Sequence, residues 1–178
     1  AHPSENQDLV NAFYRVFSIN MRVLGSPVHS KKWFEILCDQ YGKHCIMSIV
    51  YHDNIPIAVG IVLLSGNQAS IPWASTIPEY NHFSQNMLLY WSLLEYCSDH
   101  QIGEFDFGRS TFGEGTYKFK AQWGALPRLL HWHSVDKTSS PDLMQVSFPR
   151  LGLRKIVETV WRRLPLGMTV VIGPLIRR

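Results

Sequence analysis

The chain has 178 residues, a formal net charge of +3 and three cysteines. This length suffices for one domain that buries most of its apolar surface, so folding requires neither disulfides nor a metal. Cys38, Cys45 and Cys97 are odd in number, unclustered and set among apolar neighbours. They exclude a disulfide scaffold and favour buried thiols in a reducing compartment, the cytoplasm. No run reaches the roughly 18 apolar residues of a spanning helix, and the amino terminus, which looks like a cut from a longer protein, lacks the plan of a signal peptide.

The first half of the chain predicts two helices followed by three strands. Residues 9–24 carry apolar side chains at helical spacing, and Gly25 stops that pattern. A second helix begins after Ser30, a suitable N-cap, and ends at Gly42. Three β-rich runs come next, the first two joined by a tight turn that contains Asp and Asn. These runs are residues 45–51, 55–64 and 68–74.

The second half alternates helices with strands. A loop with Pro78 leads into a long helix, for which Ser84 is the expected N-cap. The next elements are a strand, a short helix and a final strand, and residues 136–142 form a polar connection. The four expected ranges are 84–100, 102–107, 115–123 and 128–135.

Charge, glycine and aromatic residues are densest between residues 105 and 124. A short strand ends at Gly108, and Arg109 and Ser110 stand where the chain leaves the sheet, a position at which functional residues gather. Helical spacing then places Phe119 and Trp123 on one face. The segment is the first place to expect a site.

The element order fits the fold of GNAT acyltransferases, and several segments resemble FemAB-like proteins, most closely those associated with exosortase (PEP-CTERM) systems. The resemblance implies an α+β (mixed α/β) fold, in which a mostly antiparallel sheet flanked by helices parts to leave a cleft. It divides the chain into a GNAT-like domain, 1–148, and a basic helical tail, 149–178, and it implies that a companion amino-terminal GNAT half is missing. The segments are 20–27, 86–91, 105–110, 115–120, 123–124 with Pro127, 161–165 and 173–174.

The implied activity is transfer of an acyl or aminoacyl group to an amine of a cell-envelope or exopolysaccharide-related acceptor. No tightly bound cofactor is expected, and the donor is acyl-CoA or aminoacyl-tRNA. Users of acetyl-CoA place a glycine-rich loop before the long helix, where backbone N–H groups hold the diphosphate. Residues 77–86 contain no glycine and include Glu79, which disfavours coenzyme A without excluding it.

Aminolysis of an ester or thioester requires a stabilised oxyanion and a protonated leaving group. No Ser-His-Asp or Cys-His motif occurs, so direct attack by the amine is favoured. Arg109 is the expected anion contact, because a guanidinium can hold phosphate or carboxylate at two points; an ion pair with Asp106 or Glu114 is the alternative. The candidate catalytic residues are Asp106, which removes a proton or orients Arg109, Tyr117 as proton donor, and Lys120, which stabilises developing charge. The candidate donor-binding residues are Arg109, Ser110, Lys118 and Asn86.

Two other features are explained most simply by structural roles. His131 and His133 share one face of the expected last strand, but no third ligand is near, so no metal site is expected. Residues 150–178 hold seven Lys or Arg and one acid, Glu158. Such a tail docks on its own domain or contacts tRNA, an acidic membrane surface or a companion domain; DNA is not expected. A non-catalytic half-domain and an RNA-binding module therefore stand as alternatives to the enzyme.

Overall fold

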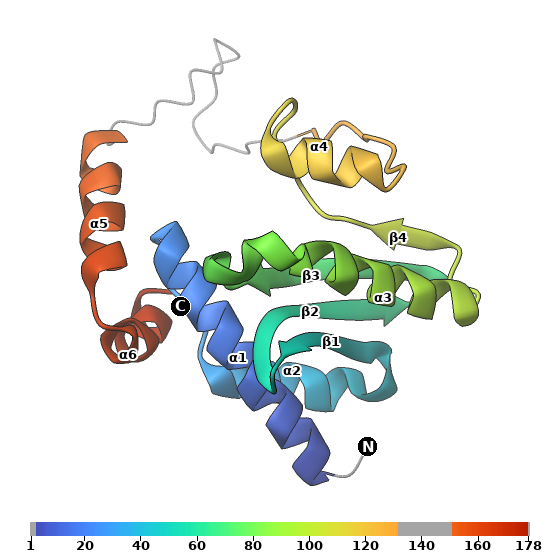
Figure 1. Ribbon diagram of the computed structural model, residues 1–178, viewed down its shortest axis with the longest axis horizontal. Helices are drawn as coiled ribbons and strands as arrows, with labels where there is room; N and C mark the ends of the chain where they lie inside the picture. The colour runs from blue at the N-terminus through green and yellow to red at the C-terminus, as the bar shows by residue number, and fades with distance from the viewer. Residues whose placement is uncertain (1–2, 132–150, 178) are drawn as a thin grey trace, which may run out of the picture.

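A four-stranded sheet in the order β1-β2-β3-β4 lies at the centre of the molecule (Figure 1). The computed structural model describes residues 3–131 and 151–177, and side chains within 7–131 and 157–177. Strands β1 (Cys45–His52), β2 (Ile55–Ser65) and β3 (Gln68–Thr76) form an antiparallel meander, and β4 (Glu104–Asp106) pairs parallel to β3. The predicted α+β fold with a mostly antiparallel sheet is confirmed.

The two predicted amino-terminal helices cover one face of this sheet. They are α1 (Pro3–Leu24) and α2 (Lys31–Tyr41). The Ser30 hydroxyl accepts a hydrogen bond from the Trp33 N–H at the start of α2, and Gly42 ends α2 with a φ of 52°. Both predicted caps are therefore present: Ser30 supplies an acceptor for an N–H at the start of α2, and the Gly42 N–H supplies a donor for the Cys38 carbonyl at its end.

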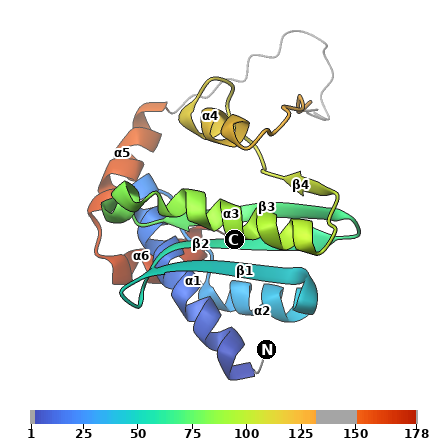
Figure 2. The same cartoon turned by 45° about the vertical axis from the view of Figure 1, so that its right-hand side comes forward.

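Helix α3 (Gln85–Asp99) covers the opposite face (Figure 2). Leu89 and Leu93 of α3 pack on Val62 and Ile71 of the sheet and are at most 1% exposed. On the α1–α2 side, Phe13, Phe17 and Phe34 form an aromatic cluster with ring centroids 4.9–5.6 Å apart. Strand β2 contributes to both cores, which is why its sequence is almost continuously apolar.

The connection from β3 to α3 contains the 3₁₀ helix η2 (Pro78–Phe83), and a shorter one, η1 (Gly42–His44), joins α2 to β1. Ser84 follows η2 and has left-handed backbone geometry, φ 54°, and its side chain does not cap α3. The expectation of a Ser84 N-cap is therefore wrong. A residue that caps a helix with its side chain normally has extended backbone geometry. The change of direction between η2 and α3 gives Ser84 left-handed geometry instead.

Beyond β4 lies α4 (Gly115–Gln122), and residues 125–131 after it belong to no helix or strand. The predicted last strand does not form over residues 128–131, and the rest of it, with His133, lies outside the described residues. Leu129 is 89% exposed, and Arg128 contacts β4 through its side chain, an ion pair of 2.8 Å to Glu104. His131 is exposed and belongs to no strand. Without a backbone partner at the sheet edge, a β-rich sequence has no ladder to join.

The tail folds as α5 (Leu151–Arg163) and α6 (Leu166–Ile176), which pack against α1 (Figure 1). Trp161 is 6% exposed, and Gly173 lies so close to Val28 that a Cβ atom there would come within 2.8 Å of it. No helix among the described residues is long and apolar enough to cross a membrane.

Candidate functional site

Strand β4 pairs along its whole length, but only with the beginning of β3. Their register joins Gln68, Ala69 and Ser70 to Glu104, Phe105 and Asp106, whereas β3 continues to Thr76. The second half of β3 therefore has no described strand on the β4 side. This parting is the one that the GNAT resemblance predicted.

A β-bulge lies at the point where the strands part. Between the pairs Leu63–Ser70 and Ile61–Trp73, β3 contains one more residue than β2. Pro72 falls in this extra stretch, where the missing N–H interrupts no ladder. The bulge turns Trp73 and Ser75 toward the α1–α2 side, while Ala74 packs with the core under α3. A bulged, unpaired strand end leaves backbone groups available for a ligand.

A cavity of about 360 Å³ opens beside this end of β3. One wall is the start of α3 and the preceding turn, and another is the carboxyl half of α1. Nearly all of its lining is uncharged and polar. The lining residues are Asn20, Ala74, Ser75, Thr76, Asn81, Ser84, Gln85 and Asn86.

The first turn of α3 faces this cavity without a cap. Ser84 supplies no side-chain hydrogen bond to it, and no other described side chain is a cap there. The backbone N–H groups of a helix's first turn have no partner within the helix and carry partial positive charge. An uncapped N-terminus beside a polar cavity is therefore suited to an anionic group such as a phosphate.

Gln85 is held rigidly at the same place. Its side chain is 2% exposed, and its Nε2 donates to the Ile77 carbonyl at 3.1 Å and to Asn81 Oδ1 at 2.9 Å. Its Oε1 is buried and has no hydrogen-bond partner in the described part of the chain. On the opposite wall, Asn20 donates to the Ser75 hydroxyl at 3.1 Å. A buried acceptor without a partner is costly, and a ligand N–H would satisfy it.

The charged segment identified from sequence forms a separate arm, residues 107–124, over the β4 edge of the sheet (Figure 2). Asp106 Oδ1 accepts from the Gly108 N–H at 2.7 Å, and Gly108 has a φ of 70°. Lys120 Nζ donates to the carbonyls of Gly108 and Arg109, both at 2.9 Å. Burial lowers the pKa of Lys120, while the Asp106 carboxylate opposes that shift. Asp106 and Lys120 therefore fix the turn that presents Arg109.

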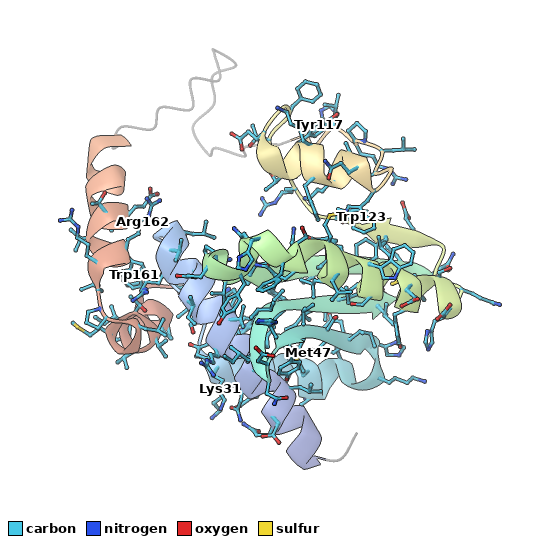
Figure 3. All side chains as sticks on the ribbon, viewed as in Figure 1. Lys31, Met47, Tyr117, Trp123, Trp161 and Arg162 are labelled. Atoms are coloured by element: carbon cyan, nitrogen blue, oxygen red, sulfur yellow. The ribbon has the colours of Figure 1, made fainter. Side chains whose placement is uncertain are left out.

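Helix α4 docks on α3 through aromatic rings. Phe119 meets Tyr90 edge-on at 4.9 Å and lies 6.4 Å from Trp123, as its spacing predicted. Tyr117 lies two positions before Phe119, on the opposite face of the helix, and its ring contacts Phe112 at 4.8 Å. Figure 3 shows Tyr117 on the side of α4 away from the sheet and Trp123 on the side toward it.

The structure brings together some predicted site residues but not all. Asn86 lines the cavity. Asp106, at the end of β4, and Lys120 of α4 meet at the turn of Gly108 and Arg109, which Ser110 follows in the chain. Lys118 is exposed on α4, and Tyr117 faces outward. Sequence reasoning missed the polar lining residues of α1, β3, η2 and the start of α3. The available signal was a cluster of uncharged polar residues at a strand end and a helix start. The missed residues are Asn20, Ser75, Thr76, Asn81, Ser84 and Gln85.

Comparison with known proteins agrees with this geometry. The family described as "Acetyltransferase (GNAT) domain" matches residues 2–121, whereas no curated protein matches the chain. Among solved structures, the chain is similar to aminoglycoside 6'-N-acetyltransferase AAC(6')-IG from Acinetobacter haemolyticus, with 10% identity, 78% of this chain and 97% of that chain covered, and a TM-score of 0.54.

Two further structures share the fold. One is aminoglycoside acetyltransferase meta-AAC0020 from an uncultured soil metagenomic sample, in complex with sisomicin, with 13% identity, coverage of 74% and 91%, and a TM-score of 0.56. The other is AAC(6')-Iy in complex with a bisubstrate analog, CoA-S-monomethyl-acetylneamine, with 10% identity, coverage of 73% and 94%, and a TM-score of 0.54. With the family match over two thirds of the sequence, they lead to one conclusion: the chain belongs to the GNAT acetyltransferase family and is an acyltransferase.

Proposed function

We propose that this domain transfers an acyl group from acyl-CoA to a primary amine, with the donor seated in the cavity between β3 and α3. The observation that carries the proposal is the uncapped N-terminus of α3, which opens onto a polar cavity of about 360 Å³ where β3 leaves β4. Its amides suit the diphosphate of coenzyme A, and the free edge of β3 suits the amide-containing arm of the donor. Glu79, which argued against coenzyme A, is exposed and is not among the cavity-lining residues.

The reaction proceeds by direct attack. The neutral amine adds to the thioester carbonyl, the C–S bond breaks, and the departing thiolate gains the proton that the amine nitrogen loses. No covalent enzyme intermediate is needed. The open cavity also favours an enzyme over the alternative of a non-catalytic half-domain, for which a cleft filled by side chains is expected.

The arm supplies a second set of contacts in this proposal. Arg109, Ser110 and Lys118 bind the donor's phosphates together with Asn86 of α3. Asp106 and Lys120 act through Arg109, because their hydrogen bonds hold the turn at Gly108. Tyr117 stays a prediction as proton donor, and α4 must turn to bring it to the cavity. The division into a catalytic domain, 1–148, and a tail, 149–178, is part of the same proposal.

The finer identity rests on the sequence resemblance to FemAB-like, exosortase-associated proteins. It favours an amine on a cell-envelope or exopolysaccharide precursor as the acceptor, at the cytoplasmic side of the membrane, and keeps aminoacyl-tRNA as the alternative donor. The tail supports a docking role, since it exposes Val157 (60%), Val171 (69%) and Leu175 (64%) on a positively charged segment. A companion GNAT domain, tRNA and an anionic membrane surface are the partners to test.

Calorimetric titration with coenzyme A and, separately, with charged tRNA tests the donor. We expect coenzyme A to bind the wild-type domain and to bind Arg109→Ala about tenfold more weakly, a loss typical of a charged hydrogen bond. Arg128→Ala is the matched control, because Arg128 is 83% exposed and paired with Glu104. Equal weakening by both variants contradicts an Arg109 contact. Binding of tRNA alone, with a steep salt dependence, replaces acyl-CoA by the RNA alternative.

A further inference from the structure

Two of the three cysteines meet beside the outer strand of the sheet. Cys38 lies in the last turn of α2, Cys45 begins β1, and η1 joins the two elements. The Cys45 thiol donates to the Cys38 sulfur across 3.2 Å. The sequence interpretation of three unclustered, buried thiols is therefore wrong for this pair. Residues distant by seven positions converge because the chain reverses at Gly42, whose φ is 52°.

Cys38 and Cys45 are half-buried and remain reachable, whereas Cys97, on the buried side of α3, is only 4% exposed. A disulfide bond has a length of about 2.05 Å, so a small side-chain movement closes the remaining gap. The hydrogen bond from Cys45 lowers the pKa of the Cys38 thiol, although burial opposes this. The same contact, with burial, raises the pKa of Cys45. The two thiols are thus chemically unequal, and the thiolate is the reactive form.

We propose that Cys38 and Cys45 form a redox-active dithiol that exchanges with low-molecular-weight disulfides, with Cys38 as the attacking thiol and Cys45 as the resolving thiol. The Cys38 thiolate attacks one sulfur of the small disulfide, forms a mixed disulfide and releases one small thiolate. Cys45 then loses its proton to solvent, attacks the Cys38 sulfur and releases the second. Two protein thiols are oxidised, and one small disulfide is reduced to two thiols.

The bond ties the carboxyl end of α2 to β1. It closes a short loop around η1 and so restricts the unfolded chain, which raises stability. No cavity-lining residue belongs to α2 or β1, so the dithiol is separate from the proposed donor site. A reducing compartment keeps the pair as thiols, and the bond forms when the disulfide pool becomes oxidised.

Incubation of the reduced full chain with oxidised glutathione, followed by peptide mapping, tests this chemistry. We expect loss of two hydrogens, a Cys38–Cys45 crosslink, and a rise in Tm on the order of 5–10 °C that dithiothreitol reverses. Cys97→Ala should behave as the wild type does. Absence of the crosslink at any oxidised-to-reduced ratio overturns the proposal, and the wild-type measurement needs no variant to fold.

Two single substitutions test the order of attack. In Cys45→Ser the reaction stops at the first step, so glutathione should remain bound to Cys38. In Cys38→Ser we expect at least a tenfold slower capture of glutathione by Cys45, because the attacking thiol is missing. Equal capture by the two variants contradicts the assigned roles, and capture mainly at Cys97 contradicts the site.

Discussion

The starts of α2 and α3 differ although both helices are anchored by fully buried side chains. Helix α2 begins with Ser30 in extended geometry, and its hydroxyl satisfies the Trp33 N–H. Helix α3 begins with Ser84 in left-handed geometry, its first turn lacks a described cap, and it faces a polar cavity. Stability alone favours the first arrangement. In the second, the Met87 N–H bonds the Ser84 carbonyl at 2.8 Å, but no described side chain caps the helix end where a ligand is proposed to bind.

The largest loss of stability should come from truncating the buried side chains that anchor α2 and α3, which are equally buried in the two helices. Phe34 of α2 and Leu89 of α3 are both 0% exposed. Phe34→Ala should lower the free energy of unfolding by about 3–5 kcal/mol and Leu89→Ala by about 2–5 kcal/mol, because each leaves a cavity in a closed core. Urea denaturation measures both losses. A loss below about 1 kcal/mol for either would show that its helix is loosely docked and would break the comparison.

Ligand binding should separate the two helix starts. Asn86→Ala, which alters a cavity-lining side chain of α3, should weaken coenzyme A binding about tenfold, as expected for one lost hydrogen bond to a charged group. Lys32→Ala is the matched change in the first turn of α2, where Lys32 is exposed, and should leave affinity unchanged. Isothermal titration measures both. A larger loss of affinity in Lys32→Ala than in Asn86→Ala would show that the anion site is not at the start of α3.

Substitutions of Ser30 and Ser84, the residues that precede the two helices, should change stability in opposite directions. Ser30→Ala removes the hydrogen bond to Trp33 and should cost about 1 kcal/mol. Ser84→Gly should raise the free energy of unfolding by about 0.5–1 kcal/mol, since glycine adopts a φ of 54° without strain. Thermal unfolding compares them. Because the donor contacts at α3 come from backbone amides, Ser84→Gly should keep its affinity for coenzyme A; a lost affinity would show that the hydroxyl takes part.

The smallest effect concerns pH. Burial raises the pKa of both Tyr14, which donates to the His29 carbonyl before α2, and Tyr90 of α3. The folded chain therefore keeps these protons at a pH at which the unfolded chain releases them. The contribution of these two tyrosines to stability should be constant below about pH 10 and fall as the pH rises above it.

Phenylalanine variants separate the two contributions to this alkaline loss. Tyr90→Phe should reduce the loss at little cost near neutrality, because no described residue bonds its hydroxyl. Tyr14→Phe should reduce it at a cost of about 1 kcal/mol. Urea titrations at pH 8 and at alkaline pH measure the free energy of unfolding of each variant. If both variants lose as much stability at alkaline pH as the wild type does, other groups are responsible for the loss.

Local features made much of the fold predictable. The turn at Asp53 and Asn54, both with positive φ, and the Ser30 and Gly42 caps depend on residues that are close in sequence. The failures were non-local. The expected strand from residue 128 needed a partner edge that the described structure does not offer, and Ser84 was diverted by η2. Asn86 was the one proposed site residue that lines the cavity.

The sequence by itself determined the order of the α-helices and β-strands from α1 to α4 and the GNAT resemblance, because periodicity, caps and turn residues act over a few positions. Tertiary structure alone decided where the cavity lies, since it depends on the parting of β3 from β4, on a bulge at Pro72 and on Asn20, 55 positions from its partner Ser75. It also decided that Cys38 and Cys45 meet while Cys97 does not. Composition cannot reveal such contacts, because they arise only when separate elements pack.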